Sequence, residues 1–184
     1  MTDKTVLITG CSSGIGECAA HGLSKRGYRV LATARQADDV ARLENSGLES
    51  FQLDASDPVS VSAAVDETLS RTGGTLYGLF NNGAYGQPGA IEDLTRDVLR
   101  EQFETNFFGW HDLTRQLLPV MRRQGYGRII QNSSVLGFVA LAYRGAYNAS
   151  KYALEGLSDT LRLELRGTDI HVSLVQPGPI ISRF

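Results

Sequence analysis

The 184-residue sequence predicts an α/β fold built on a doubly wound parallel sheet. Short β-branched runs alternate with longer amphipathic stretches, and these stretches carry apolar residues at three- and four-residue spacing, as at Leu154, Leu157, Leu161 and Leu165. No repeat and no linker rich in Pro, Gly or Ser divides the chain, so one domain over residues 1–184 is expected. Right-handed crossovers place helices on both faces of such a sheet, and ligands bind beyond the carboxyl ends of its strands.

Six strands and five helices are expected in alternating order. The strands are predicted at 5–9 (TVLIT), 28–34 (YRVLATA), 48–53 (LESFQL), 76–80 (LYGLF), 128–131 (RIIQ) and 170–175 (IHVSLV). The helices are predicted near 14–26, 37–46, 57–72, 95–122 and 147–166, where the apolar spacing changes from strand-like to helical.

The composition is that of an ordinary globular chain large enough to bury an enzyme-sized core. Hydrophobic residues make up 42% and charged residues 21%, and 18 Lys and Arg stand against 20 Asp and Glu. The resulting net charge of -2 provides no field that would gather phosphate backbones, so nucleic acid is not an expected partner.

Cysteine usage and hydropathy indicate a cytoplasmic protein. Cys11 and Cys18 lie close together without a C-x-x-C pattern, as expected for reduced thiols. No apolar run approaches the roughly 20 residues of a membrane span, and the polar start of the chain does not look like a signal peptide. His21, His111 and His171 are scattered, so no metal site is expected.

A glycine-rich loop joins the first strand to the first helix. Gly10, Gly14 and Gly16 form G-x-x-x-G-x-G, which suits close approach of a pyrophosphate to the helix N-terminus, although it differs from the G-x-G-x-x-G fingerprint. Two alternatives stay open: a purely structural tight turn, and a G-x-S-x-G nucleophile elbow around Ser12. The elbow is disfavoured because no upstream loop is left to complete an oxyanion hole.

A second motif combines a phenol, an amine and a hydroxyl. Tyr147 and Lys151 are spaced i,i+4, which places them on one helix face, and Ser134 follows a strand thirteen residues earlier. A tyrosine of ordinary pKa, about 10, is almost fully protonated at pH 7, and a nearby lysine cation would lower that pKa. Such a phenol can exchange a proton with a substrate oxygen during hydride transfer, while Ser134 hydrogen-bonds the same oxygen.

These motifs together resemble the classical short-chain dehydrogenases/reductases, a Rossmann-type family, over the whole chain. The matching positions are Thr9, Gly10, Gly14, Gly16, Asn81, Asn82, Gly83, Asn106, Ser134, Tyr147, Lys151, Pro177 and Gly178. The stretches 105–109 and 145–147 are similar to the branch that contains 17β-hydroxysteroid and retinol dehydrogenases and bacterial aldehyde reductases.

The resemblance implies a role for each matching residue. Tyr147 would be the acid or base, Lys151 would lower its pKa and bind the nicotinamide ribose, Ser134 would orient the carbonyl, and Asn106 would hold a water that links Lys151 to solvent. The implied cofactor-binding residues are Gly10, Ser12, Ser13, Gly14, Ile15, Gly16, Arg35, Asp54, Asn82, Gly83, Tyr147, Lys151, Pro177, Gly178, Ile180 and Ser182. Asp54 would face the adenine, or would alternatively cap the next helix.

The cofactor is expected to be NADP rather than NAD. A carboxylate after the second strand would bind the ribose 2′-hydroxyl of NAD and repel a 2′-phosphate. The chain has Arg35 there and no acid, and a guanidinium suits a phosphate.

The sequence departs from the family pattern in two places. The usual Asn-Asn-Ala-Gly order is altered around Asn82, Gly83 and Ala84, so Ala84 is expected at a turn position that favours the positive φ of glycine. The sequence also ends at Phe184, where the family continues into a substrate-covering segment and a seventh strand. The expectation is therefore a domain truncated before that segment. Either the sequence is incomplete relative to the native protein, or the fragment has an unfinished substrate pocket and an exposed sheet edge.

The resulting hypothesis is an NADP-dependent oxidoreductase that moves a hydride between the nicotinamide and a carbonyl or alcohol carbon. The apolar run 135–142 would wall a pocket for a lipophilic aldehyde, ketone, steroid or retinoid, or would be plain core. The alternative is a dinucleotide-binding sensor or interaction protein without turnover. The family resemblance also implies a homodimer or homotetramer.

Overall fold

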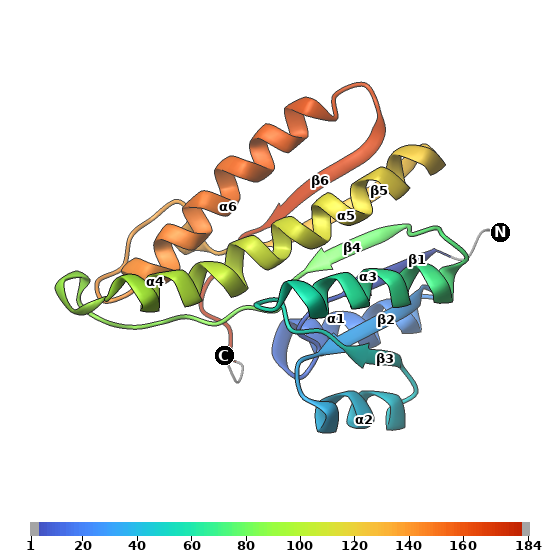
Figure 1. The fold of residues 1–184 in the computed structure, drawn as a ribbon, viewed down its shortest axis with the longest axis horizontal. Coiled ribbons are helices and arrows are strands. Elements are labelled where there is room, and N and C mark those ends of the chain that lie inside the picture. Colours follow the sequence, from blue (N-terminus) through green and yellow to red (C-terminus); the bar gives the residue numbers. More distant parts are fainter. Residues whose placement is uncertain (1–3, 182–184) are drawn as a thin grey trace.

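A six-stranded parallel sheet forms the centre of the computed structural model, which describes residues 4–181 (Figure 1). The strands are β1 (Thr5–Ile8), β2 (Arg29–Ala34), β3 (Glu49–Gln52), β4 (Gly78–Asn81), β5 (Tyr126–Asn132) and β6 (Asp169–Val175). Their order in the sheet is β3-β2-β1-β4-β5-β6, and every neighbouring pair is parallel. The predicted doubly wound α/β fold is confirmed.

Helices connect the strands in the expected order. They are α1 (Gly14–Lys25), α2 (Ala37–Asn45), α3 (Pro58–Thr72), α4 (Arg96–Phe103), α5 (Gly109–Gln124) and α6 (Gly145–Glu164), with short turns η1 (Ile91–Asp93) and η3 (Val135–Gly137). The expected continuous helix over 95–122 is wrong in one respect. A π-helical turn, η2 (Glu104–Phe108), separates α4 from α5, and such turns often mark functional sites.

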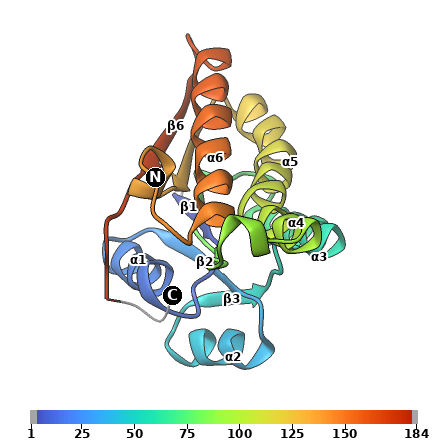
Figure 2. The ribbon, with the colours of Figure 1, turned by 90° about the vertical axis from the view of Figure 1, so that its left-hand side faces the viewer.

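The two faces of the sheet carry separate apolar clusters. Leu7 of β1 packs into a cluster formed with residues of α3 and α5, whereas its neighbours Val6 and Ile8 point the other way and pack with residues of α1 and α2. This follows from the alternation of side chains along a strand. Figure 2 shows α1 on one side of the sheet and α3 and α5 on the other.

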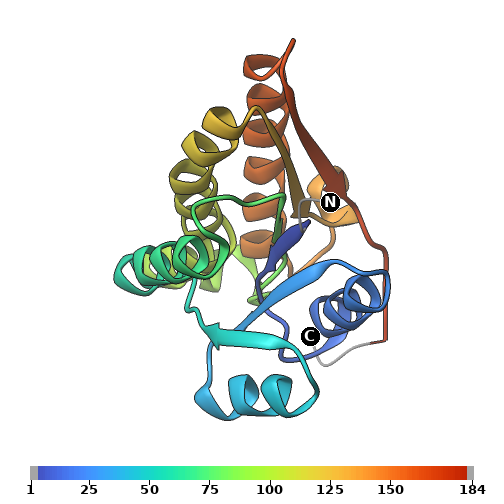
Figure 3. The same cartoon turned by 90° about the vertical axis from the view of Figure 1, so that its right-hand side faces the viewer.

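Strand β6 lies at the edge of the sheet and is covered on one face. Ile170 and Val172 are buried, while Asp169, His171 and Ser173 on the opposite face are exposed. After β6 the chain runs past α1 (Figures 2 and 3), which brings its last described residues back toward the glycine loop. Among the described residues, no helix is long and apolar enough to cross a membrane.

The strand order reverses at β1, whose neighbours are β2 and β4. The crossover helices α1 and α3 lie on opposite faces, so they diverge at the carboxyl ends of these strands. This is the place where open α/β sheets bind their ligands.

Candidate active site

The glycine loop presents the start of α1 to the crevice at this switch point. Gly10 and Gly14 have φ values of +68° and +58°, a region that side-chain-bearing residues rarely occupy. Ser13 is the N-cap residue, yet its side chain makes no capping hydrogen bond to α1. Ser13 therefore leaves the first-turn N–H groups uncapped by its own side chain, which suits an anion site at a helix N-terminus.

Hydrogen bonds from the end of β4 hold this loop in place. The Thr9 hydroxyl oxygen accepts from the backbone N–H groups of Asn82 at 2.8 Å and Gly83 at 2.9 Å. The Asn82 amide donates to the carbonyl oxygens of Thr9 at 2.9 Å and Gly10 at 3.1 Å, and it accepts from Asn132 Nδ2 at 2.8 Å. Asn82 thus braces the loop.

Glycines are required here by close packing. A Cβ on Gly10 would lie 2.3 Å from Gly83 Cα, and a Cβ on Gly16 would lie 2.3 Å from the Gly10 carbonyl oxygen. The expectation that Ala84 occupies a position of positive φ is wrong, since Tyr143 is the one described non-glycine residue with positive φ. Gly83 is needed because it touches Gly10, and its own φ is not in the positive region either.

A crevice of about 790 Å³ opens between the glycine loop, the ends of β4 and β5, and the start of α6. It brings together Gly10, Ser12, Ser13, Gly14, Ile15, Arg35, Asn82, Gly83, Ser134, Tyr147, Lys151, Pro177, Gly178 and Ile180. Three predicted residues do not line it: Gly16 lies behind the loop, Asp54 lies in an adjoining hollow, and Asn106 is buried. Ser182 lies outside the described residues.

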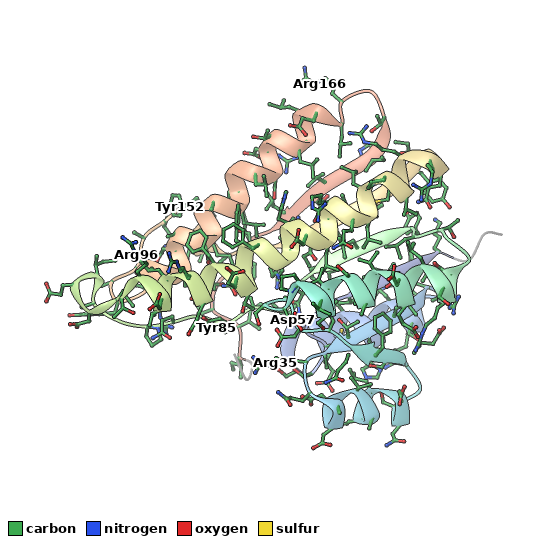
Figure 4. All side chains as sticks on the ribbon, in the orientation of Figure 1. Arg35, Asp57, Tyr85, Arg96, Tyr152 and Arg166 are labelled. Carbon is green, nitrogen blue, oxygen red and sulfur yellow. The ribbon has the colours of Figure 1, made fainter. Side chains whose placement is uncertain are left out.

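The adjoining hollow, about 520 Å³, shares Arg35 with the crevice and also contains Asp54 and Asp57. The Asp54 carboxylate accepts from the Ser56 N–H at 2.9 Å and the Ser56 hydroxyl at 2.7 Å. The alternative that Asp54 caps the next helix is wrong, because Asp57 is the N-cap of α3 and accepts from Val59 N. Figure 4 shows Arg35, Asp57 and Tyr85 beyond the carboxyl ends of β2, β3 and β4.

The phenol of Tyr147 meets the hydroxyl of Ser134 on the crevice wall. Ser134 Oγ accepts from the Leu136 N–H at 3.1 Å, which leaves its own hydrogen free to bond the phenol oxygen. Burial raises the pKa of Tyr147 above its ordinary value, while the Ser134 hydrogen bond and the positive charge of Arg144 oppose this rise. The phenol is therefore protonated at neutral pH.

Lys151 lies beneath Tyr147, almost completely buried, at the wall of the crevice. Its Nζ donates to the Asn132 carbonyl oxygen at 2.7 Å and lies 4.3 Å from the centre of the Trp110 ring and 5.5 Å from that of Tyr147. Burial lowers the pKa of Lys151 to about 7, against an opposing influence of Glu155. The expected lowering of the Tyr147 pKa by Lys151 is not seen in this structure, where burial is the largest influence on that pKa and Ser134 and Arg144 are the residues that lower it.

Asn106 and Gln102 clamp the loop that follows β4. Asn106 Nδ2 donates to the Tyr85 carbonyl oxygen at 2.8 Å, and its Oδ1 accepts from the Tyr85 N–H at 3.1 Å. Gln102, one helical turn earlier, donates to the same carbonyl at 2.8 Å and accepts from the Gln87 N–H at 2.8 Å. Both amides are completely buried. The water path through Asn106 stays a prediction.

Several residues of the site were missed in the sequence. Trp110 covers Lys151 and donates from Nε1 to the Gly83 carbonyl oxygen at 2.9 Å. It is the single tryptophan of the chain and follows Asn106 by four residues, a spacing that could have flagged it. Gln102 precedes Asn106 by four residues in the same way. Arg144, at the crevice wall, had no signal beyond its closeness to Tyr147.

The structure argues against the nucleophile-elbow alternative. No histidine is found among the described residues that line the crevice around Ser12. His111 is exposed on α5 and His171 is exposed on β6. Across residues 4–181, no group of three His, Cys, Asp or Glu side chains could hold a metal ion.

The fold and this site define a class of protein, the nucleotide-binding α/β oxidoreductases, in which a glycine loop and a Ser, Tyr and Lys set share one crevice. Residues 4–184 match the family model described as short chain dehydrogenase. The chain belongs to this family.

Similar proteins agree with this assignment. The chain is 50% identical over 181 residues to the uncharacterized oxidoreductase YbbO of Escherichia coli K12, covering 98% of this chain and 67% of that protein. It is 39% identical over 192 residues to retinol dehydrogenase 8 of Homo sapiens, covering 98% and 60%. Retinol dehydrogenase-like relatives therefore support the expected branch, and the chain spans about two thirds of the length of these relatives.

Solved structures show the same fold. A short-chain dehydrogenase from Streptomyces avermitilis superposes with a TM-score of 0.93 at 36% identity, covering 98% of this chain and 67% of that one. Actinorhodin polyketide ketoreductase with NADPH superposes with a TM-score of 0.92 at 31% sequence identity, covering 98% of this chain and 72% of that one. A Burkholderia phymatum short-chain dehydrogenase/reductase in complex with NAD superposes with a TM-score of 0.91 at 29% sequence identity, covering 97% of this chain and 66% of that one.

Proposed function

We propose that this chain is an NADP-dependent oxidoreductase that acts on the carbonyl or alcohol group of a lipophilic substrate. One observation carries the proposal: Tyr147 and the glycine loop line the same crevice. The Tyr147 phenol is hydrogen-bonded to Ser134, and the centre of its ring lies 5.5 Å from the buried Lys151 Nζ.

The crevice residues fit a dinucleotide. Gly10 and Gly14 line the crevice with positive φ values, Ser13 makes no capping hydrogen bond to the start of α1, and Lys151 supplies a buried amine at the far end. The loop and helix N-terminus would hold the pyrophosphate, and Lys151 would hold the nicotinamide ribose. A bound nicotinamide supplies or accepts the hydride.

The chain's own residues handle the proton. Because burial raises its pKa, Tyr147 holds a proton at neutral pH and can donate it to a carbonyl oxygen, which favours the reductive direction. The Ser134 hydroxyl can hydrogen-bond the same oxygen and stabilise the charge that develops on it. Lys151, with a pKa of about 7, can return a proton toward the phenol after turnover. The ratio of reduced to oxidised cofactor sets the net direction.

Arg35 supports the choice of NADP. It is exposed after β2, lines both the crevice and the adjoining hollow, and forms no salt bridge with any described carboxylate. The acids nearby are already hydrogen-bonded, Asp54 to Ser56 and Asp57 to the start of α3. A 2′-phosphate would therefore meet a free guanidinium there.

The apolar run 135–142 supports a lipophilic substrate. The alternative that this run is plain core is wrong, because Phe138 is 55% exposed and Leu141 is 56% exposed. Leu136, Leu141 and Ile180 line the same crevice as Tyr147. Apolar walls around a few polar groups are typical of small-molecule sites.

The proposal is tested by following NADPH absorbance with a panel of lipophilic aldehydes and ketones. Consumption that depends on the carbonyl compound supports it. Binding of NADPH without consumption across the panel, in the chain and in Tyr147→Phe alike, would instead establish the alternative of a non-catalytic dinucleotide-binding protein.

Compartment and assembly belong to the same proposal. Cys11 and Cys18 are free thiols, as in a reducing cytoplasm. The homodimer or homotetramer rests on family resemblance and is tested by the mass of the purified protein in solution.

A further inference from the structure

The crevice is lined by charges of one sign. Arg35, Lys151 and Arg144 line it, and no Asp or Glu is found among its described lining residues, although the whole chain has a net charge of -2. A dinucleotide accounts for Arg35 and Lys151. Arg144 is the cation left over, at the end of the crevice where the substrate would lie.

Arg144 is placed beside the reacting phenol. It is the N-cap residue of α6 and precedes Tyr147 by three residues, a spacing that brings side chains to one face of a helix. It is half-buried, and no described carboxylate forms a salt bridge with it. Its charge acts on the phenol, since it is one of the two influences that lower the pKa of Tyr147.

The backbone before Arg144 is held in a costly conformation. Tyr143 has a φ of +62°, in the left-handed region that a bulky aromatic residue rarely adopts. Its carbonyl oxygen accepts from the Gly89 N–H at 3.0 Å, and Gly89 forms an isolated parallel bridge with Arg144. Strain of this kind persists where surrounding structure over-determines it, often at ligand sites.

We propose that Arg144 binds an anionic group of the substrate, and that the substrate is an oxo acid whose carboxylate lies a few bonds from the reacting carbonyl. The inference rests on the proposed oxidoreductase function and deepens it. Leu136 and Leu141 border the same end of the crevice and would contact the aliphatic part of the molecule. A guanidinium binds a carboxylate through two parallel hydrogen bonds, so the contact would also orient the carbonyl toward Tyr147.

The test compares 4-oxononanoate with its methyl ester, which keeps the carbonyl and the chain but removes the charge. The chain should reduce the acid with a kcat/KM at least about tenfold higher than the ester, as expected for a hydrogen bond to a charged group. Arg144→Gln should erase this preference, and Arg144→Lys should restore part of it. Any effect of the lost charge on the pKa of Tyr147 would change the rates for the acid and the ester alike, so the ratio of the two rates reports the contact with the carboxylate. Arg166→Gln is the matched control, because Arg166 is exposed beyond the far end of α6 (Figure 4).

A binding measurement separates this inference from the proposed function. Nonanoate, which cannot be reduced, should bind the NADPH-loaded chain at least about tenfold more tightly than methyl nonanoate, and Arg144→Gln should abolish the difference. If the ester is reduced but Arg144→Gln leaves the preference and the binding unchanged, the inference fails and the function stands. If neither carbonyl compound is reduced and nonanoate shows no dependence on Arg144, the inference fails, and the panel of aldehydes and ketones decides separately whether the proposed function fails with it.

Discussion

The Lys151 amine donates a 2.7 Å hydrogen bond to the carbonyl oxygen of Asn132 from an almost completely buried position. This contact holds the amine at the end of β5, 4.3 Å from the centre of the Trp110 ring and 5.5 Å from the centre of the Tyr147 ring. The Asn132 carbonyl oxygen is uncharged, so it accepts one hydrogen bond from the ammonium group but does not balance its positive charge. The loss of hydration consequently dominates, and the pKa of Lys151 falls to about 7.

The lowered pKa of Lys151 predicts a pH-dependent stability. The unfolded chain binds this proton up to the ordinary pKa near 10.5, whereas the folded chain releases it near 7. The unfolded state therefore binds more protons between these values, and stability should rise with pH, by up to about 1.4 kcal/mol per pH unit. Urea unfolding of the cofactor-free chain at pH 7, 8 and 9 measures this rise.

The Lys151→Met variant is the control, because it keeps the length of the side chain and removes the titrating group. Its stability should change less over pH 7 to 9, and equal slopes for the two proteins would contradict the prediction. The measurements stop at pH 9 because of Cys11. Burial raises the pKa of its thiol to about 12, so above the ordinary thiol pKa of 9 the folded chain binds more protons than the unfolded chain and its stability falls.

Tyr147→Phe should abolish most turnover while cofactor binding is retained. The substitution removes the proton donor and leaves the ring against Lys151, so a loss of about 10²- to 10⁴-fold in kcat is expected. NADPH binding should change by less than about threefold, since the glycine loop and Arg35 are untouched. A variant with near-normal kcat would remove Tyr147 from the proposed chemistry.

Arg35→Ala should weaken NADPH binding by about tenfold or more and leave NADH binding almost unchanged. The side chain is exposed and unpaired by salt bridges among the described residues, so its removal should not disturb the fold. Dissociation constants for both cofactors provide the check. Equal losses for NADPH and NADH would reject the contact with a 2′-phosphate.

The order and type of the helices and strands were predictable, because the spacing of apolar residues in each segment matches the element it forms. Their first and last residues were less predictable, because tertiary packing sets them. The fifth strand begins at Tyr126. The sequence-based prediction started it at residue 128, because Gly127 weakened the strand pattern. A Cβ at Gly127 would lie 2.4 Å from Met121 Sδ, so glycine is required there by packing. The π-helical turn around Asn106 was equally hidden, since the apolar spacing on either side of it is that of one helix.

The site was predictable where residues lie in one motif and not where they meet only in space. Tyr147 and Lys151 share a helix, so their spacing revealed them. Gln102 and Trp110 each lie four residues from Asn106, which could have flagged them, but their hydrogen bonds to the loop after β4 span 15 to 27 residues, and no short sequence pattern encodes such contacts.

The clamp on the loop after β4 predicts a stability cost for Gln102→Met. The variant removes both hydrogen bonds of the buried amide and leaves the Gln87 N–H without this partner, at a cost of about 1–3 kcal/mol. Arg100→Met on the same helix is the control, because its pair with Asp97 is exposed and should contribute less than about 1 kcal/mol. Comparable unfolding free energies for the two variants would argue against the clamp.

Two glycines of α1 should respond to alanine in opposite directions. A Cβ on Gly16 would lie 2.3 Å from the Gly10 carbonyl oxygen and 2.5 Å from Asn82 Nδ2, so Gly16→Ala must displace the loop from the amide that braces it. We expect loss of cofactor binding and destabilisation of about 1–3 kcal/mol, as in overpacked cores. A Cβ on Gly22 would approach only the flexible end of Arg26, at 3.4 Å, so Gly22→Ala should stabilise the helix by up to about 1 kcal/mol and leave cofactor binding intact. Thermal unfolding and NADPH titration of both variants give the comparison, and the contact between loop and helix would lose its proposed importance if Gly16→Ala bound NADPH as tightly as Gly22→Ala.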